Sequence, residues 1–383
     1  LSAHDLGYLG LVDLSLRLKQ TVEVLGRLER YRGHLLNWYD TRTLQPLAPR
    51  YVSSVDSGNL VASLIALKEG CFELLEGSPA PQPRWGGLID TVDVLLETVE
   101  GPLGTDGALP AHLRAMRSQL HEGADRPEVW PALFQRLESE GMAELRRLLA
   151  EAMEAGSLGP AERQAARAWA ERVSYNVRVT QREFNHLLPW HAAFAAVGGW
   201  DQRLPGDAKA TLAELRALYG AVPSLRELAD RCRAGVALLA RFDSEVQGAP
   251  GAAATGDAAG APGARGSEPT VGAASEAGAW AHDLSKRLAS AAAAARGLVK
   301  SFEGVAAAAD AEVEHTDFTF LYDEQRDLLR IGYNVDAERL DDNYYDLLAS
   351  EARLGSLVAI AKGDLPVRHW LHLGRPLTDV DGR

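Results

Sequence analysis

The segment from Asp317 to Thr378 constrains the fold most, because its hydrophobic pattern changes from a strand period to a helix period within a short span. Large apolar residues first alternate with polar ones on either side of the polar run 323–326. Alternation with a period of two around a polar break predicts a β-hairpin that ends at Asn334. A strongly apolar helix is then predicted to open at Tyr344 and to run through Lys362. The alternating residues are Phe318, Phe320, Tyr322, Leu329, Ile331 and Tyr333.

Glu351 is a carboxylate within this apolar helix, and the helix itself supplies no cation to it. If that face is buried, a lone carboxylate costs several kcal/mol unless another segment satisfies it. The sequence therefore favours a buried ion pair for Glu351 over direct catalysis. The residues three and four positions away are Leu347, Leu348, Leu354 and Gly355, and the natural partners are Arg353, Arg32 and Arg42.

Most of the remaining chain is predicted to be helical. Apolar residues recur three or four apart from Leu11 to Arg30, which predicts an amphipathic helix with one buried stripe. The next predicted helix, Leu60 to Leu75, is apolar on most sides, and Asp56 or Ser57 can cap it by accepting from the free backbone donors of its first turn. Helix then follows helix, without the strand alternation that a parallel sheet requires. Further helices are predicted at 89–99, 110–120, 127–155, 160–195, 208–218, 223–246 and 280–314.

The segment 247–278 differs in kind, since it consists of Ala, Gly, Pro, Ser and Thr with almost no large apolar residue. Such a segment buries too little surface to offset its ordering entropy, so a disordered insertion is predicted. The predicted organisation is one helical domain over 1–246 and 279–383, interrupted by this insertion.

Composition excludes several classes of function. The net charge of −13 argues against a nucleic-acid surface. No apolar run approaches the length of a membrane span, and two cysteines cannot form a disulfide framework. His369 and His372 are three apart, but no carboxylate cluster supports them, so no metal is expected. The chain begins with Leu1 rather than Met and is interpreted as a fragment.

Two blocks of sequence resemble the bacterial cyclic β-1,2-glucan synthases. The C-terminal block carries an ordered series of motifs, and the N-terminal block carries a second series in the order of the family. The similarity covers roughly the first 75 and the last 65 residues closely, while the middle matches only in helical character. The motifs are IGYN at 331–334, YYDLLASEAR at 344–353, AIAKGD at 359–364, HW at 369–370, LGRPLT at 373–378, RYRGH at 30–34, NWYDTR at 37–42 and VDSGNL at 55–60.

The resemblance is to the central, glucoamylase-like region of these synthases, which lies between a membrane-embedded glycosyltransferase and a C-terminal glycoside-phosphorylase-like domain. It implies a mainly α fold, an incomplete (α/α)6-barrel-type domain with a small β-hairpin near 317–334. It also implies that the intact parent closes linear β-1,2-glucan into rings by a retaining transglycosylation. The glutamates that serve this chemistry are expected beyond 373–378, so the catalytic residues are unknown and the chain alone is expected to be inactive.

The same resemblance implies the surroundings of the segment. The expected partners are β-1,2-glucan chains and other domains of the same synthase, with no nucleic acid and no membrane span in this chain. No cofactor is expected in this region, whereas UDP-glucose would be the donor for the glycosyltransferase domain of the parent. The segment itself would be soluble, at the cytoplasmic face of the bacterial inner membrane as part of a membrane-anchored protein.

Candidate glucan-binding residues are those whose side chains suit sugars, since aromatic faces lie against sugar rings and carboxylates or amides bind hydroxyl groups. Simpler interpretations stay open for several of them: Asp56 as a helix cap, Tyr344 and Tyr345 as packing residues, and Glu351 as an ion-pair member. The candidates are Trp38, Tyr39, Asp40, Arg42, Asp56, Ser57, Asn59, Tyr333, Asn334, Tyr344, Tyr345, Asp346 and Glu351.

Two alternatives to the synthase interpretation remain at this point. The parent could be a stand-alone hydrolase of β-1,2-glucan with the same type of barrel. The segment could also be a non-catalytic helical spacer that positions neighbouring catalytic domains. An upstream glycosyltransferase with membrane spans would decide for the synthase over the hydrolase. Unaltered ring formation and glucan binding after substitution of Trp38, Asp56 and Tyr345 would favour the spacer.

Overall fold

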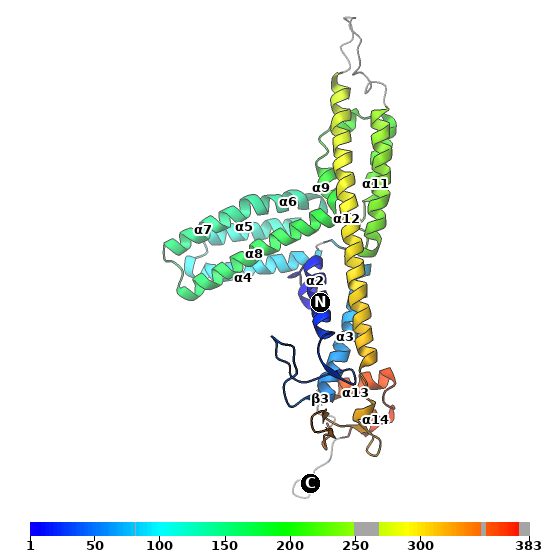
Figure 1. Cartoon of the computed structure of the whole chain (residues 1–383). Helices are drawn as coiled ribbons and strands as arrows, with labels where there is room; N and C mark the ends of the chain where they lie inside the picture. The colour runs from blue at the N-terminus through cyan, green and yellow to red at the C-terminus, as the bar shows by residue number, and fades with distance from the viewer. Residues whose placement is uncertain (81, 249–267, 346–349, 375–383) are drawn as a thin grey trace, which may run out of the picture. The chain divides into compact units, whose positions relative to one another are not determined.

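The computed structural model describes residues 1–80, 82–248, 268–345 and 350–374. These residues are mainly helical and include three small sheets, which confirms the predicted mainly α class, whereas the barrel stays a prediction. The chain forms two compact units (Figure 1). The first unit comprises Leu1–Leu14 and Leu75–Val299, and the second unit comprises Ser15–Leu74 and Lys300–Arg383. The unit boundaries fall within three helices, α2, α3 and α12.

In the first unit, four long helices lie alongside one another: α4 (Gln82–Leu103), α5 (Ala108–Gly123), α7 (Met142–Glu154) and α8 (Pro160–Leu187) (Figure 1). The helix predicted over 127–155 is divided into a 3-10 turn (Pro127–Val129), α6 (Trp130–Arg136), a π-helical stretch (Leu137–Gly141) and α7. The core of these helices is aromatic, and the indole ring of Trp85 lies 5.4 Å from that of Trp130 and 5.3 Å from the ring of Phe134. Burial of these large rings packs α6 against α4.

The remaining helices of the first unit are α1 (Ser2–Asp5), α9 (Pro189–Ala195), α10 (Gly206–Leu218), α11 (Leu225–Gln247) and the N-terminal part of α12 (Glu268–His315), with a 3-10 turn at Trp200–Arg203. The helix predicted over 160–195 breaks before Pro189, because proline lacks the backbone N–H that a continuous helix needs. The ring of Trp190 stacks on Tyr219 at 4.3 Å. α11 begins with a capping box of Ser224 and Glu227.

The predicted insertion is shorter than 247–278. Residues 268–278 are the first turns of α12 and Gln247 is the last residue of α11, so the prediction of disorder is wrong for them. Alanine favours helix, and Ala273 and Ala277 are buried. The prediction considered only the entropy cost of ordering this segment, and these two contributions offset that cost. Residues 249–267 lie outside the described residues.

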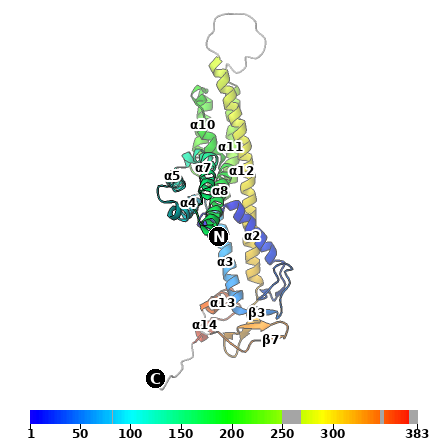
Figure 2. The same ribbon diagram turned by 90° about the vertical axis from the view of Figure 1, so that its left-hand side faces the viewer.

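The second unit contains most of α2 (Leu11–Leu25) and α3 (Ser54–Glu76), the end of α12, α13 (Ser350–Lys362) and α14 (Arg368–His372). Strands β1 (Arg30–Tyr31) and β2 (His34–Leu35) form one antiparallel pair. Strand β6 (Gly332–Asn334) lies between β3 (Tyr51–Ser53) and β7 (Arg339–Leu340) in a second sheet (Figure 2). In the pairing of β3 with β6, Tyr51 lies opposite Asn334 and Ser53 lies opposite Gly332. The two family-like blocks therefore meet in one sheet.

The hairpin predicted over 317–334 is present only near its turn. Strands β4 (Tyr322–Asp323) and β5 (Leu328–Leu329) pair antiparallel, and the Asp323 carboxylate accepts from the backbone N–H groups of Gln325 and Arg326. Phe318 instead lies in the hydrophobic core, followed by a 3-10 turn (Thr319–Leu321), and Tyr333 belongs to the other sheet. The alternating pattern correctly predicted the turn between β4 and β5. It did not show that the residues around Tyr333 belong to a second sheet.

Helix α3 begins at Ser54, earlier than the predicted Leu60. The Ser53 hydroxyl accepts from the backbone N–H of Asp56 at 3.2 Å and satisfies one free donor of the first turn. Asp56 and Ser57 lie within that turn, so the prediction that one of them caps the helix is wrong. Because the helix begins earlier than predicted, Asp56 lies within its first turn, and its side chain is exposed to solvent.

Helices α3 and α13 cross at two glycines. A Cβ atom on Gly58 would lie 2.3 Å from the Cα of Gly355, closer than any real contact. Around the crossing, the core of the second unit combines Val61 and Leu64 of α3 with Val358 and Ala359 of α13. The glycines therefore allow the two helices to bury their apolar faces against each other.

Replacement of Gly58 by alanine is expected to lower the free energy of unfolding by about 2 kcal/mol, because the added methyl group overpacks a backbone contact. The measurement is urea unfolding followed by circular dichroism. Gly304→Ala is the matched control in the same unit, since nothing lies within 4 Å of the position that its added methyl group would take, and it should be neutral or stabilising by up to about 1 kcal/mol. If Gly58→Ala and the unsubstituted chain had the same free energy of unfolding, the close contact between Gly58 and Gly355 would be contradicted.

Candidate functional site

Four residues from both family-like blocks lie around Tyr345 in the second unit. Together with it they form what we call the Tyr345 cluster: Tyr51, Asp56, Asp341, Tyr345 and Glu351. Tyr51 is on β3, Asp56 and Glu351 lie in the first turns of α3 and α13, and Asp341 follows β7. The Tyr51 hydroxyl donates to Asp341 Oδ2 at 3.1 Å. The three carboxylates lie close enough to Tyr345 for their charges to act on its pKa.

The Tyr345 cluster keeps its two phenols protonated. Burial raises the pKa of Tyr345, and the negative charges of Asp56, Glu351 and Asp341 raise it further, because a phenolate there would be repelled. Burial and the hydrogen bond to Asp341 raise the pKa of Tyr51 as well. Burial opposes ionisation of Asp341, but hydrogen bonds from Asn343 and Tyr51 outweigh it and lower its pKa. The cluster therefore presents hydroxyl donors beside anionic acceptors.

This arrangement can bind hydroxyl groups, since Asp56 and Glu351 are exposed and can accept hydrogen bonds from a ligand. Tyr345 also lines a small cavity with Ser54, Val55 and Ala352. The cavity has a volume of about 10 Å³, enough for roughly one water molecule. A sugar would therefore contact the exposed carboxylates rather than enter this cavity.

The predicted buried ion pair of Glu351 is wrong, because the side chain of Glu351 is exposed, as is that of Arg353. Helix α13 buries a different face, which carries Ala352, Ser356 and Ala359. A solvated carboxylate needs no cation, so the desolvation cost that motivated the prediction does not arise.

The loop 37–42 has mainly structural contacts. The Tyr39 hydroxyl accepts from the backbone N–H of Leu36 at 2.7 Å and donates to the carbonyl of Glu29 at 2.6 Å. The Asp40 carboxylate closes a turn by accepting from the N–H groups of Arg42 and Thr43. Trp38 is 66% exposed and presents a flat aromatic face to solvent. The Arg42 side chain is exposed beside Asp40, with 3.8 Å between the charged atoms.

The other predicted contact residues are held by neighbours within the second unit. Tyr333 stacks on Tyr31 with 5.0 Å between the ring centroids. The Asn334 amide oxygen accepts from the N–H of Ala337, and the Tyr344 hydroxyl donates to Asp323. Asn59 is partly buried within α3. Asp346 lies outside the described residues.

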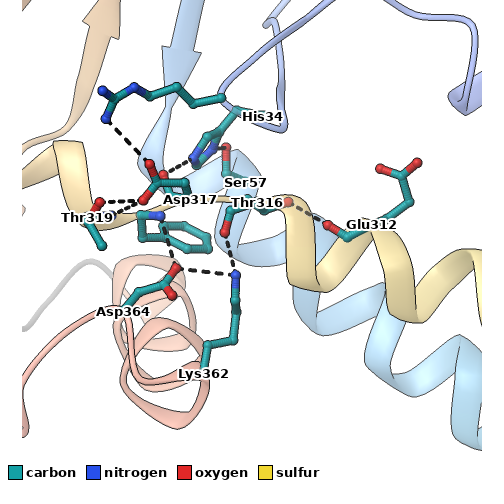
Figure 3. A network of polar contacts seen from close by, with 10 residues as sticks. His34, Ser57, Glu312, Thr316, Asp317, Thr319, Lys362 and Asp364 are labelled. Carbon is teal, nitrogen blue, oxygen red and sulfur yellow. Dashed lines mark hydrogen bonds and ion pairs between the residues drawn. The ribbon is translucent and has the colours of Figure 1, made fainter.

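Ser57 belongs to a buried network rather than to a solvent-facing surface (Figure 3). Its hydroxyl bonds Nδ1 of His34 at 2.7 Å, and Nε2 of His34 bonds the Asp317 carbonyl at 2.7 Å. Because a carbonyl can only accept, Nε2 carries the proton and Nδ1 accepts from Ser57. Nearby, Lys362 pairs with Asp364 at 3.3 Å and donates to the Thr316 carbonyl.

His369 makes a second connection of the same kind. Its Nδ1 bonds the Asp327 carbonyl at 2.9 Å, and its Nε2 bonds the Ser356 hydroxyl at 2.7 Å. Each buried imidazole thus links a helical serine to a loop carbonyl. Burial lowers the pKa of His34 and of His369, so both rings are neutral near pH 7.

These pKa shifts predict a loss of stability in acid. Since folding lowers the pKa of His34 and His369 below 6.5, the unfolded chain binds protons more readily, and stability is full above about pH 6.5 and falls below it. Each ring contributes at most about 1.4 kcal/mol per pH unit. Urea unfolding at about pH 7.5 and about pH 5.5 should show this slope.

The matched variants are His34→Gln, which should flatten the pH dependence, and His282→Gln on the exposed face of α12, which should leave it unchanged. Burial also lowers the pKa of His191 in the first unit, to about 4. His191 is present in the parent chain and in both variants, so it adds the same pH dependence to each. The same slope in His34→Gln and in the parent would contradict the assignment.

Three of the predicted candidates, Asp56, Tyr345 and Glu351, lie near one another in the structure, whereas sequence reasoning did not select Tyr51 or the two histidines. The only signal for Tyr51 was its position before the polar motif 55–60.

Among the described residues, no group of three or more His, Cys, Asp or Glu side chains is arranged to hold a metal ion. In the same part of the chain, no helix has the length and apolarity needed to cross a membrane.

Comparison with known proteins identifies one relationship. The chain is similar to the cyclic beta-(1,2)-glucan synthase NdvB of Rhizobium meliloti (strain 1021), with 33% identity over 389 aligned residues. The similarity covers 100% of this chain and 10% of that protein, so the chain spans about a tenth of the relative's length. No family model matches the chain. The resemblance found in the two sequence blocks is thereby confirmed.

Proposed function

Because the chain is homologous along its whole length to a segment of the cyclic β-(1,2)-glucan synthases, we propose that it binds β-1,2-glucan and contributes to ring closure by transglycosylation. The intact parent would be a glycosyltransferase that uses UDP-glucose at another domain. The observation that carries the proposal is the Tyr345 cluster, in which both family-like blocks supply exposed carboxylates and protonated phenols.

The chemistry of the Tyr345 cluster suits a glucan. A sugar chain offers many hydroxyl groups and no charge, so it is bound by several hydrogen bonds to carboxylates and by contact with aromatic faces. Asp56 and Glu351 accept from hydroxyls, and Tyr345 can donate. Trp38, in the loop 37–42 and not part of the cluster, offers an exposed ring. We assign these residues to glucan binding and leave the nucleophile and the acid/base outside this chain.

A non-catalytic spacer is the second candidate, and the small size of the cavity at Tyr345 favours it. A space of about 10 Å³ cannot enclose a glucosyl unit, so a spacer with an incidental polar surface would have the same appearance. A β-1,2-glucan hydrolase is the third candidate and would release shorter linear chains instead of rings.

Asp56→Asn and Tyr345→Phe in the full-length synthase should each weaken glucan binding and lower the yield of cyclic glucan by about five- to tenfold, since each removes roughly one hydrogen bond to the ligand. The measurements are the chromatographic yield of rings and the affinity for linear β-1,2-glucan. Both substitutions keep the shape of the side chain.

Glu324→Gln is the control, because Glu324 is an exposed carboxylate of the same unit in the turn between β4 and β5. It should leave binding and ring yield unchanged. Unaltered binding and ring formation in both test variants would support the spacer, and linear products from the parent would support the hydrolase.

A further inference from the structure

The Asp323 carboxylate, in the turn between β4 and β5, makes contacts that the turn itself does not require. Its Oδ1 atom accepts from the backbone N–H groups of Gln325 and Arg326 and so closes the turn. Its Oδ2 atom instead accepts from two side chains beyond the turn, Arg330 Nη2 at 2.7 Å and the Tyr344 hydroxyl at 2.5 Å. The side chain of Asp323 is only 11% exposed, so these bonds are largely shielded from water.

Both of these donors hold the segment 341–345, which carries two members of the Tyr345 cluster. At the start of the segment, the carbonyl of Asp341 accepts from Arg330 Nη1 at 2.9 Å. Near its end, Tyr344 forms an antiparallel bridge with Arg330, whose guanidinium lies 5.3 Å from the centroid of the Tyr344 ring. Asp323 bonds both of these side chains and therefore fixes the segment at both ends.

The orientation of Tyr345 follows from this anchoring of its neighbour. Within the described part of the chain, the Tyr345 hydroxyl has no hydrogen-bond partner that could hold it. The backbone at Tyr344 is extended, since it lies in a bridge, and successive side chains of an extended chain point to opposite sides. When Asp323 fixes the side chain of Tyr344 on one side, it also fixes the direction in which Tyr345 leaves the backbone on the other.

We propose that Asp323 is a positioning residue for glucan binding, which acts through Tyr344 to hold Tyr345 in the Tyr345 cluster. This inference rests on the glucan-binding role proposed for that cluster above. Asp323 itself would not bind the sugar, because its two oxygens already accept four hydrogen bonds and a carboxylate has about four acceptor sites. A residue that only closed the turn would need just one of these oxygens.

Two substitutions in the full-length synthase remove the anchor and leave its surroundings in place. In Asp323→Asn the amide oxygen can keep the bonds of the turn, while the amide nitrogen cannot accept from Arg330 or Tyr344. Tyr344→Phe removes only the hydroxyl group and keeps the ring. Each should weaken the affinity for linear β-1,2-glucan by about three- to tenfold. The double variant should match the weaker-binding single variant within about twofold, because both changes remove the same hydrogen bond.

Tyr322→Phe is the matched control. It also removes a hydrogen bond between a tyrosine and an aspartate of this hairpin, since the Tyr322 hydroxyl donates to Asp327 at 2.6 Å. Asp327, however, is bonded to Arg368 of α14 and not to the segment 341–345. The control should change the affinity for glucan by less than about twofold.

Fluorine NMR separates positioning from a general loss of stability. The whole chain carries meta-fluorotyrosine at position 345, and its resonance is recorded without glucan. In Asp323→Asn and in Tyr344→Phe the resonance should broaden or move toward its position in the urea-unfolded chain, whereas Tyr322→Phe should leave it unchanged. Circular dichroism verifies that the helices are retained, and a variant that is only less stable keeps the resonance of the parent.

The inference is overturned if the resonance at position 345 is the same in Asp323→Asn and in the parent. It is also overturned if Asp323→Asn and Tyr344→Phe bind glucan as the parent does although Tyr345→Phe binds it more weakly. In that case the binding role of the Tyr345 cluster stands and only the role of Asp323 fails. If Tyr345→Phe itself binds glucan unchanged, the proposed function fails and the inference fails with it.

Discussion

Pairing of β3 with β6 is the interaction on which the second unit depends. It brings Val52 opposite Tyr333, and the N–H of Ser54 donates to the Ile331 carbonyl where the strand ends. The approach is so close that a Cβ on Gly332 would lie 2.3 Å from the Val52 carbonyl oxygen. The loop that this pairing closes includes nearly all of the first unit, but the entropy of loop closure grows only with the logarithm of length. A large helical insertion between two paired strands is therefore tolerated.

The two buried histidines satisfy carbonyl groups elsewhere in the second unit, those of Asp317 and Asp327. Where strands are only two or three residues long, neighbouring loops keep carbonyl groups that no strand satisfies. His34 and His369 each donate one ring N–H to such a carbonyl and accept a serine hydroxyl with the other nitrogen. A neutral imidazole is the one common side chain that can donate and accept in opposite directions across a rigid ring, so it fixes the loop to the helix without burying a charge.

Sequence reasoning predicted the parts of this fold that depend on local pattern. The helices of the first unit were predicted as segments separated by Gly and Pro, and the turn at Asp323 was predicted from a polar break. Helix starts were less predictable, because the cap of α3 is Ser53, which serves a strand and a helix at once. The contacts of Ser57 and Glu351 could not be predicted, since whether a helical side chain is buried depends on the segment that packs on it. The pairing of β6 with β3 could not be predicted either, because β3 lies far away in the sequence.

The same packing explains why the two predicted carboxylates of the Tyr345 cluster remain available. Asp56 and Glu351 lie in the first turns of α3 and α13, where free backbone N–H groups and the helix dipole favour negative charge. Both side chains are exposed to solvent. The crossing of Gly58 and Gly355 holds the N-terminal turns of both helices near Tyr345, so rigidity comes from the backbone rather than from salt bridges. A site built in this way keeps its hydrogen-bond acceptors free for a neutral, hydroxyl-rich ligand, because no internal cation has to be displaced before the ligand binds.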